Sequence, residues 1–89
     1  MKNKQILGAL AMDLKRVALG YFRGSLPMAE KFYEEALKTK GEIDIKNVSP
    51  YIIKLLSKID NMKKEDKARA AEDALLYSTL FQNASSVIL

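Results

Sequence analysis

The sequence predicts an all-α protein, an antiparallel up-and-down four-helix bundle in a single domain over residues 1–89. Apolar residues recur at intervals of three and four along most of the chain, which is the spacing of a helix with one buried face. Gly and Pro residues divide the chain into helix-sized segments. The links between these segments are short, and short links make neighbouring helices antiparallel.

The first helix is predicted from about Asn3 to Phe22. Five apolar residues at intervals of three and four give it one apolar face. They are Leu7, Leu10, Leu14, Val17 and Tyr21. Gly20, Gly24 and Ser25 then break the register, so the helix is expected to end in this region.

The second helix is predicted to start at Ser25 or Leu26, with Pro27 in its first turn, where a missing N–H costs nothing. Gly41 is the expected C-cap. The buried stripe of this helix consists of Met28, Ala29, Phe32, Tyr33 and Ala36.

Part of this segment resembles the second helix of a tetratricopeptide repeat unit. The resemblance is carried by Ala29, Tyr33, Ala36 and Leu37, and it implies close packing on a neighbouring helix and peptide binding in a groove. No second copy follows in the sequence, and such repeats need about three copies to form a stable stack. We therefore interpret the pattern as the packing signature of a helix hairpin.

Residues 42–48 alternate briefly between apolar and polar side chains and are interpreted as a connection. Ile43, Ile45 and Val48 are expected to cover the end of the core. A short helical turn capped by Asp44 is the alternative.

The third helix is predicted to begin with Ser49 as N-cap and Pro50 as its first residue, and to end at Asp60–Asn61. Its inner face consists of Ile52, Leu55, Leu56 and Ile59.

The fourth helix is predicted to begin between Met62 and Glu65. Its buried seam is made mostly of small residues, whereas the seam of the first helix is made mostly of large ones. The seam consists of Ala71, Ala74, Ser78, Phe81, Ser85 and Ile88. Large residues facing small ones permit close packing, so the first and fourth helices are predicted to pair in the core.

The composition limits the chemistry. The chain has no cysteine and no histidine, which excludes disulfides, thiol catalysis, zinc–thiolate sites and Ser-His-Asp catalysis. We therefore expect no enzyme, no metal and no cofactor. The net charge of +4, many Lys and Glu residues and the lack of Cys suggest a cytoplasmic protein. No stretch is apolar enough to span a membrane, so no membrane partner is expected.

Both terminal helices carry apolar residues on the side opposite their core face. On the first helix these are Met12 and Leu19, and on the fourth they are Leu76, Leu80 and Val87, with Asn83 in the same row. One interpretation is that the 42–48 connection covers them within the monomer. The other is an interface in which Asn83 fixes the register, as polar residues do in coiled coils. The predicted function is accordingly a small protein–protein interaction module that forms a homo-oligomer or binds another helical protein.

Charged residues suggest one alternative function. Cations cluster around the end of the third helix and the start of the fourth, namely Lys54, Lys58, Lys63, Lys64, Lys67 and Arg69. Such a cluster could contact phosphates in a weak nucleic-acid-binding accessory protein. Four acidic residues interleave with these cations, which makes this function the second choice. Elsewhere, Asp13 is expected to pair with Arg16 in solvent, three residues along the same helix.

Overall fold

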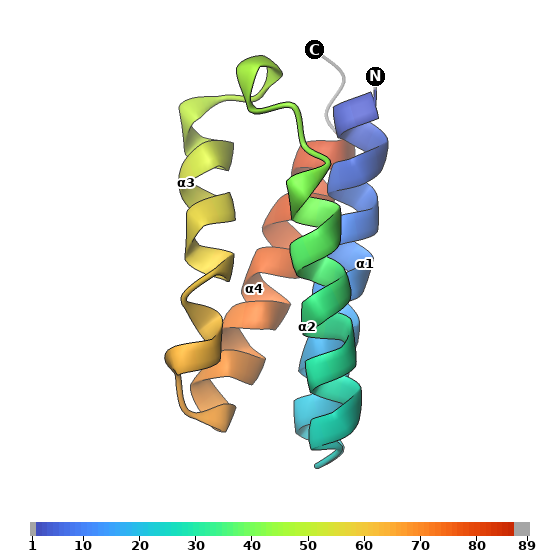
Figure 1. The fold of residues 1–89 in the computed structure, drawn as a ribbon, viewed down its shortest axis with the longest axis vertical. Helices are drawn as coiled ribbons and strands as arrows, with labels where there is room; N and C mark the ends of the chain where they lie inside the picture. The colour runs from blue at the N-terminus through green and yellow to red at the C-terminus, as the bar shows by residue number, and fades with distance from the viewer. Residues whose placement is uncertain (1, 87–89) are drawn as a thin grey trace.

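The computed structural model describes residues 2–86, and within them it confirms the predicted all-α, up-and-down four-helix bundle (Figure 1). The four helices are joined by one turn and by two links, each of which contains a short 3₁₀ segment. In chain order the elements are α1 (Lys2–Phe22), α2 (Leu26–Gly41), η1 (Ile45–Asn47), α3 (Pro50–Ile59), η2 (Met62–Lys64) and α4 (Lys67–Ser86).

The helix α1 is the central element of the bundle. The closest backbone approaches between helices join α1 to α4 and α1 to α2. In Figure 1, α1 and α3 run downward while α2 and α4 run upward, so sequential neighbours are antiparallel. The short helix α3 lies apart from the other backbones, and large side chains fill the space between them.

The predicted pairing of the first and fourth helices is confirmed. On α4 the buried seam consists of Ala70, Ala71, Ala74, Ser78, Phe81 and Ser85. The Ser78 hydroxyl donates a hydrogen bond of 2.8 Å to the carbonyl oxygen of Ala11. Burying this hydroxyl therefore leaves no unpaired polar group at the seam. Ile88, which was predicted to extend the seam, lies outside the described residues.

Two glycines shape the connection between α1 and α2. Gly24 adopts a left-handed φ of 71°, and the backbone N–H of Ser25 donates to the Gly20 carbonyl at 2.8 Å. The N–H of Gly24 donates to the carbonyl of Tyr21 at 3.1 Å. These two bonds form the Schellman arrangement that ends many helices. The helix α1 ends at Phe22, as predicted. Gly20 itself is helical and takes part in this ending through its carbonyl.

The connection after α2 contains the short turn that was the alternative prediction. The Asp44 carboxylate caps η1 by accepting a hydrogen bond from the Lys46 N–H at 3.1 Å. Asn3 holds this turn on α1 through two bonds of 2.9 Å to the Asp44 backbone. Ile43 is buried as predicted, but Ile45 is 59% exposed. The expected role of Ile45 is wrong because the turn rotates its side chain away from the core.

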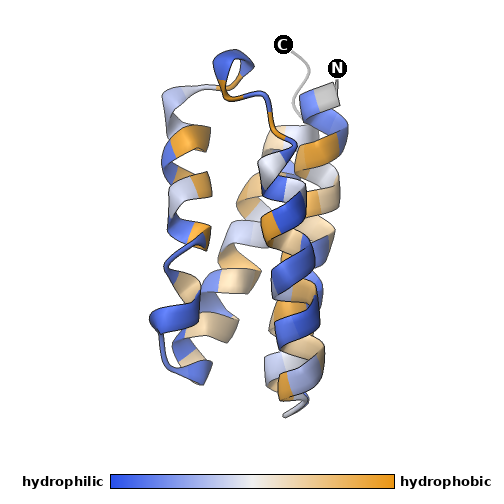
Figure 2. Ribbon diagram, viewed as in Figure 1, coloured by the Kyte–Doolittle hydropathy of each residue, from blue (hydrophilic) through white to orange (hydrophobic). Residues whose placement is uncertain are grey.

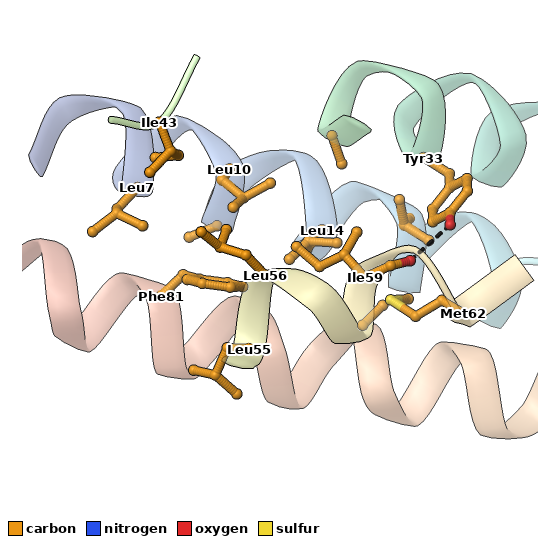
Figure 3. Close-up of a cluster of buried hydrophobic side chains, with 14 of the residues drawn as sticks. Leu7, Leu10, Leu14, Tyr33, Ile43, Leu55, Leu56, Ile59, Met62 and Phe81 are labelled. Carbon is orange, nitrogen blue, oxygen red and sulfur yellow. Dashed lines mark hydrogen bonds between the residues drawn. The ribbon is translucent and has the colours of Figure 1, made fainter. Parts of the chain in front are cut away.

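The predicted start and inner face of the third helix are confirmed. Ser49 caps α3 by accepting from the N–H of Ile52 at 3.3 Å. Figure 2 shows the apolar residues of α3 on the side turned toward the other helices. Figure 3 shows Leu56 and Ile59 reaching toward Leu14 of α1. The Tyr33 hydroxyl donates a 2.7 Å hydrogen bond to the Ile59 carbonyl, which ties α2 to the end of α3.

The last helix begins later than predicted. The 3₁₀ segment η2 occupies the predicted start, and α4 itself begins at Lys67. Asp66 precedes it and accepts a hydrogen bond from the Arg69 N–H at 2.9 Å. This side-chain cap explains why the α-helix starts here, since it satisfies an N–H that has no partner within the helix.

Candidate functional site

The first candidate site is a surface on the side of α1 and α4 that points away from the core. Met12 is 47% exposed, Leu75 44% and Leu76 53%. The Ala11–Ser78 hydrogen bond places Met12 within about one helical turn of Leu75 along the bundle axis. Met12 and Leu75 each point to the side of the Ala11–Ser78 contact that lies away from the buried core. We call the three exposed apolar residues Met12, Leu75 and Leu76 the α1/α4 outer face; Leu76 lies at its edge, because it points about 160° around α4 from Ser78.

The structure separates the six predicted interface residues into different environments. Met12, Leu76 and Asn83 are exposed. Leu19 is half-buried, and so is Leu80, which packs against the core at the edge of α4. Val87 lies outside the described residues.

Leu75 belongs to the outer face but was missed by the sequence analysis. The predicted row follows heptad spacing through Leu76, Leu80 and Asn83, and Leu75 is not one of its positions. The signal that could have identified it is the pair Leu75–Leu76 itself. Consecutive residues on a helix point about 100° apart, so Leu75 and Leu76 cannot both face a narrow core stripe.

The predicted basic cluster is exposed and mixed with acidic groups. Its six residues come from the outer side of α3, from η2 and from the first turn of α4, and all are exposed. Figure 2 shows the link between α3 and α4 mostly in the hydrophilic colour. The Arg69 guanidinium lies 3.2 Å from the carboxylate of Glu65 and 3.9 Å from that of Asp73. Arg69 is thus held by two carboxylates rather than presented alone to a phosphate.

Burial changes the acid–base behaviour of the groups around Arg69. Burial raises the pKa of Glu65, and the nearby Asp73 raises it further through a hydrogen bond and its charge, while Arg69 opposes this change. Burial also raises the pKa of Tyr77, with added repulsion from Asp73 and Glu65. Glu65 and Asp73 thus interact with each other as well as with the Arg69 guanidinium.

The second candidate site is a cleft of about 260 Å³ at the lower end of the bundle as drawn in Figure 1. It lies between the end of α1, the first turns of α2, η2 and the start of α4. Tyrosine and aliphatic side chains combine with charged groups of both signs around it. The lining residues are Tyr21, Leu26, Glu30, Tyr33, Glu34, Met62, Lys63, Glu65 and Lys67.

The two phenols of the cleft are held in the neutral form. Burial raises the pKa of Tyr21, and the negative charge of Glu30 adds to this effect. Burial also raises the pKa of Tyr33, with a further contribution from the charge of Asp60. A phenol of ordinary pKa is already protonated at neutral pH, so these raised pKa values extend the protonated form to more alkaline solution. The Tyr33 hydroxyl is already donated to Ile59.

The predicted pairing of Asp13 with Arg16 is wrong. Asp13 instead accepts a hydrogen bond of 2.9 Å from the Thr39 hydroxyl of α2. Arg16 lies over the ring of Phe32, with its guanidinium carbon 5.4 Å from the ring centroid. Both side chains thus help to join α1 to α2, because α2 packs directly beside them.

No group of three acidic side chains within residues 2–86 is close enough to hold a metal ion. None of the helices described here combines the length and the apolar character needed to cross a membrane. No protein-family model, curated protein or solved structure matches this chain. The function must therefore be inferred from the geometry and charge of the two candidate sites.

Proposed function

We propose that this chain is a non-enzymatic protein–protein interaction module that forms a homodimer through the α1/α4 outer face. The observation that carries the proposal is the exposure of Met12, Leu75 and Leu76 on two adjacent helices. Burying apolar surface of this kind is favourable by roughly 25 cal/mol per Å². Association with a second protein that covers this face would therefore be favourable.

A second copy of the chain is a suitable partner for two reasons. Two antiparallel helices form an outer face that can pack on itself about a two-fold axis, the commonest symmetry of soluble dimers. Exposed charges of both signs also lie near these residues in the sequence, Lys15 on α1 and Glu72 on α4. A two-fold related copy could therefore place a cation of one chain near the carboxylate of the other. Asn83 would supply a polar contact that favours one register.

The proposal is tested by measuring the solution mass by light scattering over a hundredfold range of concentration. The wild-type chain is expected to be a dimer that dissociates on dilution. Leu76→Glu is expected to give a monomer with an unchanged helical circular dichroism spectrum, because the new carboxylate would be buried without a partner in the dimer.

Leu37→Glu is the matched control for this test. It makes the same chemical change at an exposed position of α2, away from the outer face, and is expected to leave the dimer intact. A wild-type chain that stays monomeric at every concentration would overturn the proposal. Equal loss of the dimer in both variants would also overturn it, since the effect would then not depend on the outer face.

The alternative function, weak nucleic-acid binding through the basic cluster, draws support from the exposure of its six cations. It requires a gel shift at low salt that weakens as salt is added. Combined replacement of Lys63, Lys64 and Lys67 by Gln should abolish that shift. A chain that gives no shift at low salt is not a nucleic-acid-binding protein.

A further inference from the structure

The cleft at the lower end of the bundle has charges of opposite sign on facing walls. Glu30 and Glu34 are four residues apart on α2, so both lie on the same side of that helix. Lys63 of η2 and Lys67 of α4 come from the other side of the cleft. Within residues 2–86, none of these four groups takes part in an ion pair shorter than 4.0 Å.

The remaining carboxylate of the cleft does not cancel the positive wall. Glu65 lies between the two lysines in the sequence, but its carboxylate is 3.2 Å from the guanidinium of Arg69. The wall formed by η2 and the start of α4 therefore keeps an excess of positive charge, opposite the negative charge of α2.

The surface between the two charged walls is partly apolar. Leu26 is exposed and Tyr21 is half-buried, so these two residues present apolar surface to the cleft, whereas Met62 and Tyr33 are buried and present little. The Tyr33 hydroxyl already donates its hydrogen bond to the Ile59 carbonyl, so it is not a free donor for a ligand. A ligand with an apolar middle would cover this surface and displace water from it.

We propose that the cleft binds a small zwitterion whose ammonium and carboxylate are separated by a short apolar chain. The ammonium would lie near Glu30 and Glu34, and the carboxylate near Lys63 and Lys67. The volume of about 260 Å³ falls just below the roughly 300–1,000 Å³ typical of pockets for drug-sized ligands. This size suits an ω-amino acid or a dipeptide and is small for a nucleotide cofactor.

The proposal is tested by adding 6-aminohexanoic acid to the isotopically labelled chain and following its backbone amide signals by NMR. Saturable shifts are expected at residues 26–34 and 62–67, with a dissociation constant on the order of 1 mM. Hexanoic acid and hexylamine, each lacking one of the two charges, are expected to bind several-fold more weakly. Absence of saturable shifts with 6-aminohexanoic acid would overturn the proposal, and so would equal binding of hexylamine.

Two variants, each with a matched control, test which charged side chains of the cleft bind the ligand. Glu34→Gln and Lys67→Gln are each expected to weaken binding about threefold to fivefold, as for partly exposed ion pairs. Glu35→Gln and Lys64→Gln are the matched controls, since both residues are exposed neighbours that do not line the cleft. Equal weakening by the controls would show a general charge effect and would refute the assigned site.

Discussion

Gly20 determines how closely α1 and α2 can approach. A Cβ atom built on Gly20 would lie 2.6 Å from the backbone nitrogen of Ala29 and 2.9 Å from its Cα. Backbone atoms cannot move aside as a flexible side chain can, so any larger residue would push the helices apart. Ala29 is fully buried at this contact. The two small residues thus allow the backbones of α1 and α2 to pack directly.

Gly20→Ala is therefore expected to lower the free energy of unfolding by about 1–3 kcal/mol, the usual range for overpacking. Gly8→Ala is the control on the same helix, since its Cβ would meet only Ser85 at 3.7 Å and 3.8 Å. That change should stabilise the chain by up to about 1 kcal/mol through helix propensity. Urea unfolding of both variants measures the difference. A Gly20→Ala chain as stable as Gly8→Ala would contradict the close contact.

Tyr33 makes a second contact that depends on a single group. Tyr33→Phe removes the hydroxyl and leaves the Ile59 carbonyl without its 2.7 Å bond, which should cost about 1 kcal/mol at neutral pH. The folded pKa of Tyr33 is raised above the usual value of 10.0. Its stabilising contribution is therefore fully present below that value and is lost as the pH rises through the folded pKa.

The difference between wild type and Tyr33→Phe should accordingly shrink when urea unfolding is repeated above about pH 10. Tyr21 and Tyr77 also have raised pKa values and contribute to alkaline destabilisation in both proteins. Tyr51→Phe, at an exposed position of α3, is the control and should change little at either pH. If the stability difference between wild type and Tyr33→Phe grew with pH, the raised pKa of folded Tyr33 would be contradicted.

At the scale of the elements, the contact between α1 and α4 is the main packing interaction. It combines large residues of α1 with the small residues of α4, and α4 contributes Phe81 as its one large buried side chain among the described residues. Ala74 is fully buried at the centre of this contact. Its size therefore limits how close the two helices can come.

Ala74→Leu is expected to destabilise the chain by about 1–3 kcal/mol because three extra carbon atoms enter a filled core. Ala68→Leu makes the same change at an exposed position of α4 and should have little effect. Thermal unfolding followed by circular dichroism compares the two. Similar melting temperatures would mean that the seam can expand without cost.

The same contact explains how much of the fold the sequence could predict. The spacing of Leu10 and Leu14 on α1 and of Ala74 and Phe81 on α4 is a local pattern, and it was enough to identify the pairing. The exposure of Ile45 depends on the cap made by Asp44 and on its bonds to Asn3, 41 residues away in the chain. Sequence spacing carries no information about such a distant contact.

The candidate sites were predictable to different degrees. The exposure of Met12 and Leu76 agrees with their helical phase opposite the core. Leu80 has almost the same phase as Leu76 but is half-buried at the edge of the core, because helices pack around α4 unevenly. The cleft could not be predicted, since it combines Glu30 and Lys67 from elements whose relative position only the fold determines.

At the scale of the whole molecule, the two candidate sites are separate. The outer face lies on α1 and α4, on the side away from the core, whereas the cleft lies at one end between α2 and η2. Neither site uses the inner face of α3. A change that weakens α3 is therefore expected to affect stability without altering the residues of the outer face.

The position of α3 predicts how the molecule opens. Its backbone lies apart from the other helices (Figure 1), and it is attached mainly by the buried side chains of Ile52, Leu55, Leu56 and Ile59. Few close backbone contacts and a short length favour local opening, whereas α1 is covered by both α2 and α4. Native-state hydrogen exchange should therefore show lower protection for the amides of α3 than for those at the centre of α1.

A cavity in the α3 contact should widen this difference. Leu56→Ala is expected to lower the free energy of opening of α3 by about 2–5 kcal/mol, because Leu56 is buried in the cluster shown in Figure 3. Ile53→Ala, at an exposed position of the same helix, is the control and should change it little. If the amides of α3 and α1 exchange with the same free energy in the wild type, and both fall together in Leu56→Ala, the four helices unfold as one unit and α3 does not open on its own.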